Sequence, residues 1–311
     1  MNTNSSSAAA AAQPPLAAGL ASAVTAYLIW GLTPIYFKSL AMVPPFEILM
    51  HRIVWSFALL LPLMAITQRW PYFVNALKSP RLLLILMVST LLVGTNWFLF
   101  IYAINTNRIL QTSLGYYINP LVNVLLGMIF LGERLRRLQL LAVALAVVGV
   151  GYLTLYYGTF PGIALALAFS FAFYALVRKL APVAAIEGLA VETLLLSVPA
   201  LAFLMYLNQQ GTGAIFRLGP RVDLLLMGTA AATAVPLLLF TFGARILKLT
   251  TIGFLQYIAP SCTFLLAVFI YHEPLRQAQL ISFGLIWTAL AIFSFDAFRY
   301  QQRRHRALAP V

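Results

Sequence analysis

Two charged residues lie deep within apolar segments of the sequence, where each is expected to bind a group of opposite charge. Arg52 lies in the segment 46–66 and Glu192 in the segment 187–207, each about six residues from the start of its segment. A charge at this depth in a membrane costs on the order of 3 kcal/mol by insertion scales, so it needs a partner. We expect Arg52 to bind an anionic group of a solute, and Glu192 to bind a cationic group or a proton.

A structural role for the same two residues stays open. Arg52 and Glu192 are 140 residues apart, the spacing that relates the two halves of the chain. The two charges are therefore placed to meet near a central cavity and lock the halves together. Alternatively, Arg52 extends its guanidinium to the outer interface. Glu47 and His51, one turn apart at the mouth of the same segment, are expected at the interface as well.

Uncharged polar residues form a second candidate group. Tyr116, Asn119 and Asn123 follow one another at i, i+3 and i+7, which places them on one narrow helix face. Amides within hydrocarbon face protein or water, so this face either lines a solute path or joins helices by hydrogen bonds. The candidates for the path besides Arg52 and Glu192 are Asn96, Tyr116, Asn119, Asn123 and Gln256, with the aromatic residues Trp30, Trp97 and Tyr102.

Prolines within the apolar segments are candidate hinges, because each removes a backbone donor from its helix. Pro120 and Pro260 are 140 residues apart and are therefore equivalent positions of the two halves. We expect these two prolines to act as a pair of hinges.

The elements that must position these residues are membrane-spanning helices. Hydrophobic residues make up 62% of the 311 residues, about 193, and charged residues only 9%, whereas soluble proteins have about 25% charged residues. A spanning helix needs about 20 mostly apolar residues, so the chain has enough for about ten. The ten segments expected to span are 16–38, 46–66, 82–104, 109–131, 138–157, 160–181, 187–207, 222–246, 251–271 and 277–298.

An internal repeat divides these spans into two sets of five. Shifting the chain by 140 residues gives ten identities among the 24 positions 117–140, without a gap. A repeat with an odd number of crossings enters the membrane from opposite sides, which predicts an inverted pair, the architecture of many alternating-access transporters. Duplication kept for packing alone is the alternative. The predicted units are a disordered tail 1–15, a first repeat 16–157, a second repeat 158–298 and a basic cytoplasmic tail 299–311.

The distribution of Lys and Arg predicts that both termini are cytoplasmic. With that orientation, fourteen basic residues lie on the cytoplasmic side and five on the outer side, as the positive-inside rule requires. The net charge of +13 is therefore spread over short loops and a tail at one membrane face, and a nucleic-acid partner is not expected.

Several kinds of catalytic site are missing from the sequence. No phosphate-binding GxxxxGK[ST] loop is present, the three histidines are isolated, and no acidic residues form a close pair within a span. Cys262 is the only cysteine, so no intrachain disulfide forms. We expect no enzyme activity, no cofactor and no metal site.

Specific strings of the sequence resemble one family. They are Tyr27-Leu-Ile-Trp-Gly-Leu-Thr-Pro-Ile-Tyr-Phe-Lys38, His51-Arg-Ile-Val-Trp-Ser56, Asn96-Trp-Phe-Leu-Phe-Ile-Tyr-Ala103, Ser113-Leu-Gly-Tyr-Tyr-Ile-Asn-Pro-Leu121 and Leu255-Gln-Tyr-Ile-Ala-Pro260. The chain resembles the RarD branch of the EamA-type drug/metabolite transporters over nearly its whole length after the tail. The resemblance implies a ten-helix permease of the bacterial inner membrane, with relatives that export amino acids and other small metabolites. It names neither the solute nor the residues that bind it.

The sequence thus predicts an all-α integral membrane protein of ten spans that moves a small metabolite, amino-acid-like solute or drug by alternating access, outward. Its partners are the solute and membrane lipid, with coupling to a proton or counter-solute and a monomeric or homodimeric state left open. A passive channel or a non-transporting membrane sensor is the main alternative. A membrane enzyme acting on a lipid or isoprenoid is the other, although it lacks a clustered constellation of acid, base or metal ligands.

Overall fold

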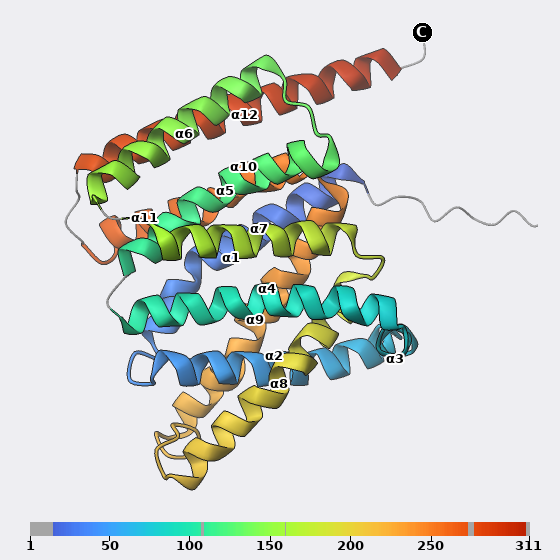
Figure 1. The fold of residues 1–311 in the computed structure, drawn as a ribbon, viewed down its shortest axis with the longest axis vertical. Helices are drawn as coiled ribbons and strands as arrows, with labels where there is room; N and C mark the ends of the chain where they lie inside the picture. Colours follow the sequence, from blue (N-terminus) through green and yellow to red (C-terminus); the bar gives the residue numbers. More distant parts are fainter. Residues whose placement is uncertain (1–14, 107–108, 159, 273–276, 309–311) are drawn as a thin grey trace, which may run out of the picture.

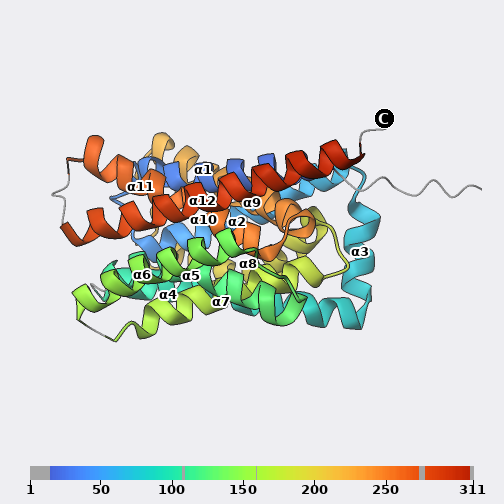
Figure 2. The same ribbon diagram turned by 90° about the horizontal axis from the view of Figure 1, so that it is seen from above.

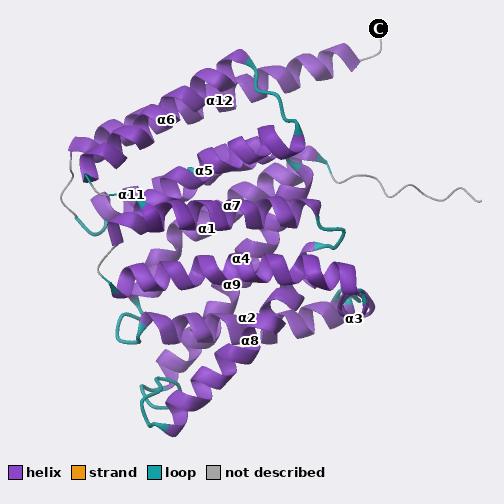
Figure 3. Ribbon diagram, viewed as in Figure 1, coloured by secondary structure: helices purple, strands orange, loops and turns teal. Residues whose placement is uncertain are grey.

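The computed structural model describes residues 15–106, 109–158, 160–272 and 277–308, and within these ranges every regular element is a helix (Figure 3). Ten helices are long and apolar enough to span a membrane, and the predicted fold class is confirmed. In chain order the helices are α1 Leu16–Lys38, α2 Pro45–Ile66, α3 Trp70–Lys78, α4 Pro80–Asn105, α5 Ile109–Leu131, α6 Arg137–Tyr157, α7 Gly162–Leu180, α8 Ala185–Gln209, α9 Pro220–Ile246, α10 Leu249–Gln256, α11 Ile258–Phe269 and α12 Gln277–Leu308.

The ends of the spans follow from local turn chemistry. Proline opens α2, α4 and α9, where its missing N–H costs nothing because the first helical amides have no intrahelical partner anyway. Gly132 and Gly158 follow α5 and α6 in the left-handed conformation, with φ of 62° and 63°, which glycine adopts without steric cost. Most of the predicted tail 1–15 lies outside the described residues, and α12 extends as helix into the predicted tail 299–311.

The short helix α3 was not predicted. It fills the connection between the second and third spans and lies across the ends of the long helices (Figure 2). Its residues Phe73 and Ala76 are buried while Trp70 and Tyr72 are exposed, so it packs one face against the bundle. We call the membrane face that holds α3 the inner face and the opposite face, which holds the loop 210–219, the outer face, following the predicted orientation.

The helices pack in pairs that match the 140-residue repeat. Helix α1 packs on α9, and the equivalent helices α7 and α4 pack on each other in the same way. Three further contacts join equivalents directly, namely α2 with α8, α5 with α10, and α6 with α12, the last pair lying along one edge of the bundle (Figure 1). This exchange of contacts is expected of two equivalent halves related by a pseudo-two-fold axis.

The ninth predicted span is broken into two helices. Helix α10 ends at Gln256 and α11 begins at Ile258, and Pro260 lies in the first turn of α11. Proline has no N–H to donate to the carbonyl four residues earlier, and its ring clashes with that carbonyl, so the break falls just before it. Pro120, in contrast, lies inside the continuous helix α5. Only one of the two predicted hinges therefore coincides with a break in its helix.

Candidate functional site

Arg52 lies in the outer half of α2 and has no carboxylate partner among the described residues. Its Nε donates to Thr233 Oγ1 of α9 at 3.0 Å. The guanidinium also lies over the rings of Phe37 and Trp97, at 5.2 and 5.6 Å from their centroids. Cation–π contacts and one neutral hydrogen bond compensate the charge only in part. The side chain is only partly buried, so it remains free to receive an anion.

Tyr116 indicates that this part of the bundle contains accessible space. The tyrosine is 48% exposed, although it shares one face of α5 with Asn119 and Asn123, which are 2% and 0% exposed. Leu125, on the opposite side of α5, is also exposed, and so is Phe130 near the inner end of the face that carries the two asparagines. Tyr116 lies within electrostatic range of Arg52 and packs against Phe100 of α4 with 6.1 Å between the ring centroids, so its exposed area lies beside the surroundings of Arg52.

Glu192, in the inner half of α8, is buried and has charged and polar partners, unlike Arg52. It is 1% exposed, and its carboxylate accepts hydrogen bonds from Ser89 Oγ at 2.6 Å and Tyr174 Oη at 3.2 Å. The Nε of Arg178, which is fully buried, lies 3.4 Å from Glu192 Oε1. The two ions neutralise each other, and the carboxylate has no vacant side toward a solute in this structure.

The structure therefore does not bring Arg52 and Glu192 together. Arg69, just after α2, bonds Glu187 at the start of α8 at 3.2 Å, so α8 begins at the membrane face where α2 ends. Arg52 and Glu192 each lie seven residues from the start of their helix, about 10 Å at 1.5 Å per residue. In a hydrocarbon core about 30 Å thick, the two charges are then on opposite sides of the midplane, about 10 Å apart in depth. Equivalent positions of an inverted repeat lie equally deep in the membrane, but measured from opposite faces. The expectation that Arg52 and Glu192 meet did not take this difference in depth into account.

The polar face of α5 joins helices. Asn119 Nδ2 donates to the carbonyl of Ala168 on α7 at 2.5 Å, and Asn123 Nδ2 donates to Asn119 Oδ1 at 3.1 Å and to Gln256 Oε1 of α10 at 2.8 Å. All three amides are buried. Of the two roles predicted for this face, the geometry favours hydrogen bonding between helices. The network lies where the repeat-related helices α5 and α10 cross.

The other predicted path residues fall in four different places. Asn96 is partly buried and donates to Leu167 O at 2.9 Å and to Ser170 Oγ at 3.1 Å, which ties α4 to α7. Trp30 packs in an aromatic cluster with ring centroids 5.7 Å from both Tyr27 and Phe240. Trp97 contacts Arg52. Tyr102 stacks on Phe98 on the exposed side of α4, away from the face that carries Trp97, so nothing in the structure connects it to Arg52.

Ionic and capping contacts close the inner face between the halves. Besides the Arg69–Glu187 pair, the carboxylate of Glu133 accepts the backbone amides of Leu249 and Thr250 at 2.7 and 2.9 Å, and so caps the N-terminus of α10. These contacts, together with Ser89–Glu192, join α4, α5 and the α2–α3 connection to the second half.

At the outer face, Glu47 and His51 are not interfacial as expected. Each is 2% exposed. Glu47 Oε1 accepts the backbone N–H of Ala214, in the loop 210–219, at 2.6 Å. The loop 210–219 packs against the start of α2 together with Leu40, Val43, Ile48 and Val222. This packing explains why Glu47 and His51 are buried although they lie near the start of a span.

Sequence reasoning missed Arg178 and Thr233, the partners of the two interior charges. Arg178 lies near the end of the predicted span 160–181, where a basic residue is expected to set the orientation of the chain. The available signal was Gly188, next to Glu187 in the following helix. A Cβ at Gly188 would lie 1.9 Å from Arg178 Nη1, so only glycine leaves room for the buried guanidinium.

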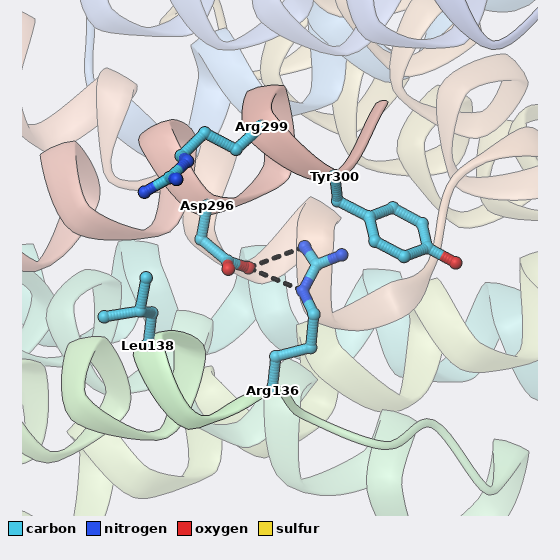
Figure 4. Close-up of a pocket in the computed structure, with 5 residues that line it drawn as sticks. All are labelled: Arg136, Leu138, Asp296, Arg299 and Tyr300. Carbon is cyan, nitrogen blue, oxygen red and sulfur yellow. Dashed lines mark hydrogen bonds and ion pairs between the residues drawn. The ribbon is translucent and has the colours of Figure 1, made fainter. Parts of the chain in front are cut away.

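A pocket of about 250 Å³ lies elsewhere, between the inner ends of α6 and α12 (Figure 4). Arg136 bonds Asp296 through Nε and Nη2, both at 2.6 Å, and its guanidinium lies 4.2 Å from the centre of the Tyr300 ring. Because this pair joins the last helices of the two halves at the membrane surface, the pocket is no part of the path around Arg52.

Comparison with known proteins places these features in a family. Residues 17–155 match the EamA-like transporter family. The chain is 48% identical over 286 residues to Protein RarD of Escherichia coli (strain K12), covering 92% of this chain and 96% of that protein. It is equally similar to an uncharacterized transporter of Vibrio cholerae, and 30% identical to the chloramphenicol-sensitive protein RarD of Pseudomonas aeruginosa, in each case over 93% of this chain and at least 96% of the relative. One crystal structure shares the fold, with a TM-score of 0.68 at 19% identity over 89% of this chain and 97% of that one.

The close approach at Gly188 generates a prediction. Gly188→Ala should lower the stability of the protein by about 1–3 kcal/mol, because the added methyl group displaces the Arg178 guanidinium from its site. Gly151→Ala is the matched control, since Gly151 also lies in a spanning helix and has no atom within 4 Å of an added Cβ. Thermal unfolding of the purified protein in detergent measures both. Equal melting temperatures for the two variants would show that Arg178 adapts freely.

Proposed function

This chain belongs to the EamA-like transporter family and, within it, to the RarD group, and from that membership we propose that it is a secondary transporter for a small solute that carries an anionic group. It is a multi-pass protein of the inner membrane. The single observation that carries the proposal is Arg52, a charge inside the membrane that has aromatic and hydroxyl neighbours but no counter-ion among the described residues. A carboxylate or phosphate of the solute completes its coordination.

Alternating access is the proposed mechanism, with the two halves 16–157 and 158–298 exchanging roles. The family match over residues 17–155 coincides with the first half, and the matched helix pairs support two equivalent units. In the described conformation, accessible residues lie in the outer half, around Arg52 and Tyr116, and the buried ionic cluster around Glu192 lies in the inner half. We therefore assign this conformation as open to the outer side and closed to the inner side.

Glu192 has a gating role in this scheme. Opening the inner face separates α4 from α7 and α8, and this breaks the bond between Ser89 and Glu192. The Arg178–Glu192 pair stays within the second half and keeps both charges compensated during the movement. Export then loads solute at the inner face, with the carboxylate exposed, and releases it at the outer face. A proton or a counter-solute supplies the driving force.

Replacement of Arg52 tests the solute site. Purified protein in proteoliposomes is screened for counterflow of labelled amino acids and of chloramphenicol, in which solute on one side accelerates entry of labelled solute; a channel does not show this acceleration. We expect counterflow of carboxylate-bearing solutes. Arg52→Ala should reduce it about tenfold or more, equivalent to at least 1.4 kcal/mol of lost binding, and Arg52→Lys should retain part of it.

Arg81→Ala is the control, because Arg81 is an exposed arginine at the start of α4. Full counterflow by Arg52→Ala, at the same amount of folded protein, would refute the assignment of Arg52. Counterflow by wild-type protein of uncharged solutes alone would refute the anionic character of the solute.

The orientation is tested by labelling single cysteines in a Cys262→Ser background. Gln210→Cys places a thiol in the exposed outer loop, and Lys248→Cys places one in the exposed connection before α10. A membrane-impermeant maleimide should label position 210 in intact cells with a permeable outer membrane, and position 248 only after the inner membrane is opened. The reverse pattern would show that both termini are outside.

A further inference from the structure

His51 is a buried imidazole that no part of the proposed solute site uses. It is 2% exposed, and neither ring nitrogen has a hydrogen-bond partner within the described part of the chain. Buried polar side-chain atoms almost always have a partner, so two unpaired nitrogens on one ring need an explanation. A site that binds something absent from this structure is one such explanation.

Glu47 supplies the nearest complementary group, one helical turn before His51. Its Oε1 lies 3.8 Å from His51 Nε2, which is too long for a hydrogen bond. The same oxygen accepts the backbone N–H of Ala214 at 2.6 Å and so attaches the loop 210–219 to α2. Two nitrogens thus lie near one carboxylate oxygen, and only the loop amide is close enough to bond it.

The other charged groups around His51 leave Glu47 as its closest partner. On α2 the neighbouring charge is Arg52. On α9, Arg221 is exposed and Asp223, within electrostatic range of His51, is bonded to the Phe216 amide of the loop at 2.7 Å. The outer parts of α8 and α4, residues 193–209 and 90–105, contain no Asp, Glu, Lys, Arg or His. Arg217 is directed at loop carbonyls.

We propose that His51 and Glu47 form a proton-binding site that controls the attachment of the loop 210–219 to the outer end of α2. A proton from the outer solution adds to the free ring nitrogen, and no covalent bond breaks. The imidazolium then forms an ion pair with Glu47, which draws the carboxylate oxygen away from the Ala214 amide. Loss of the proton to either solution restores the attachment of the loop.

This site is suited to coupling, a step that rests on the proposed function. His51 is adjacent in sequence to Arg52, and the loop that Glu47 holds connects α8 to α9, which carries Thr233, the hydrogen-bond partner of Arg52. Protonation on the outer side therefore loosens the outer end of the same helices that surround the solute site. Proton entry in exchange for solute exit follows from this connection.

Hydrogen–deuterium exchange of the loop tests the proton site without any solute. Protection of the loop 210–219 is measured between about pH 3 and pH 8, because burial moves the charge change of a histidine below its usual range, and it is corrected for the intrinsic pH dependence of exchange. Wild-type protein should lose protection about fivefold or more as the pH falls, with one midpoint. His51→Gln and Glu47→Gln should each show no transition, because the first has no titrating ring and the second no carboxylate to attract it.

His272→Gln is the matched control, a histidine in a different outer connection, and should behave as wild type. A wild-type loop whose corrected protection is independent of pH, or an unchanged transition in His51→Gln, would overturn the proposal. The pH dependence of the wild-type loop is measured without any variant, so the proposal can be refuted even if a variant fails to fold.

A transport arm separates the coupling from the proposed function. In proteoliposomes with labelled amino acids, His51→Gln should keep counterflow at equal pH and lose the acceleration caused by a pH gradient. Persistence of that acceleration in His51→Gln would refute the coupling. Absence of counterflow in wild-type protein would refute the proposed function instead, and the exchange result on the loop would be unaffected.

Discussion

The free-energy cost of a charge in hydrocarbon is the constraint on which the interior of this protein depends. Glu192 and Arg52 both lie near the level of the membrane core and meet this cost differently. Glu192 is neutralised by Arg178 and bonded by Ser89 and Tyr174, and no part of its carboxylate is exposed. Arg52 has one hydroxyl and two aromatic rings. The complete coordination of one charge and the incomplete coordination of the other are the basis for assigning them to a gate and to a solute site.

The same constraint shapes the two membrane faces. Glu47 and Glu187 occupy equivalent positions in the first turns of α2 and α8, and both are buried. Glu187 meets an arginine, whereas Glu47 meets a backbone amide and a histidine 3.8 Å away. An arginine keeps its charge at every physiological pH, but a histidine does not. The duplicated architecture thus carries a permanent ionic contact at one face and, in our proposal, a proton-dependent one at the other.

Much of the fold was predictable from the sequence because the membrane imposes it. Runs of about 20 apolar residues must become helices, so all ten spans were identified within a few residues. Contacts between helices were much harder to predict from the sequence. Gln256 was predicted as a path residue, but its bond to Asn123 depends on the crossing of α5 and α10. Arg178 looked like any basic residue at the end of a span, and its burial depends on Gly188, ten residues later. The repeat suggested that Arg52 and Glu192 meet, although inversion places them at different depths.

The central claim is that the cluster around Glu192 holds the inner face closed while the site at Arg52 is open to the outside. Pulsed electron paramagnetic resonance tests it directly, with spin labels at Arg81→Cys and Lys248→Cys in a Cys262→Ser background. These exposed positions lie at the inner ends of the first and second halves. The account predicts one dominant short distance in the otherwise wild-type protein and a second, longer distance when Glu192→Gln weakens the cluster. Identical distance distributions for the two proteins would contradict it.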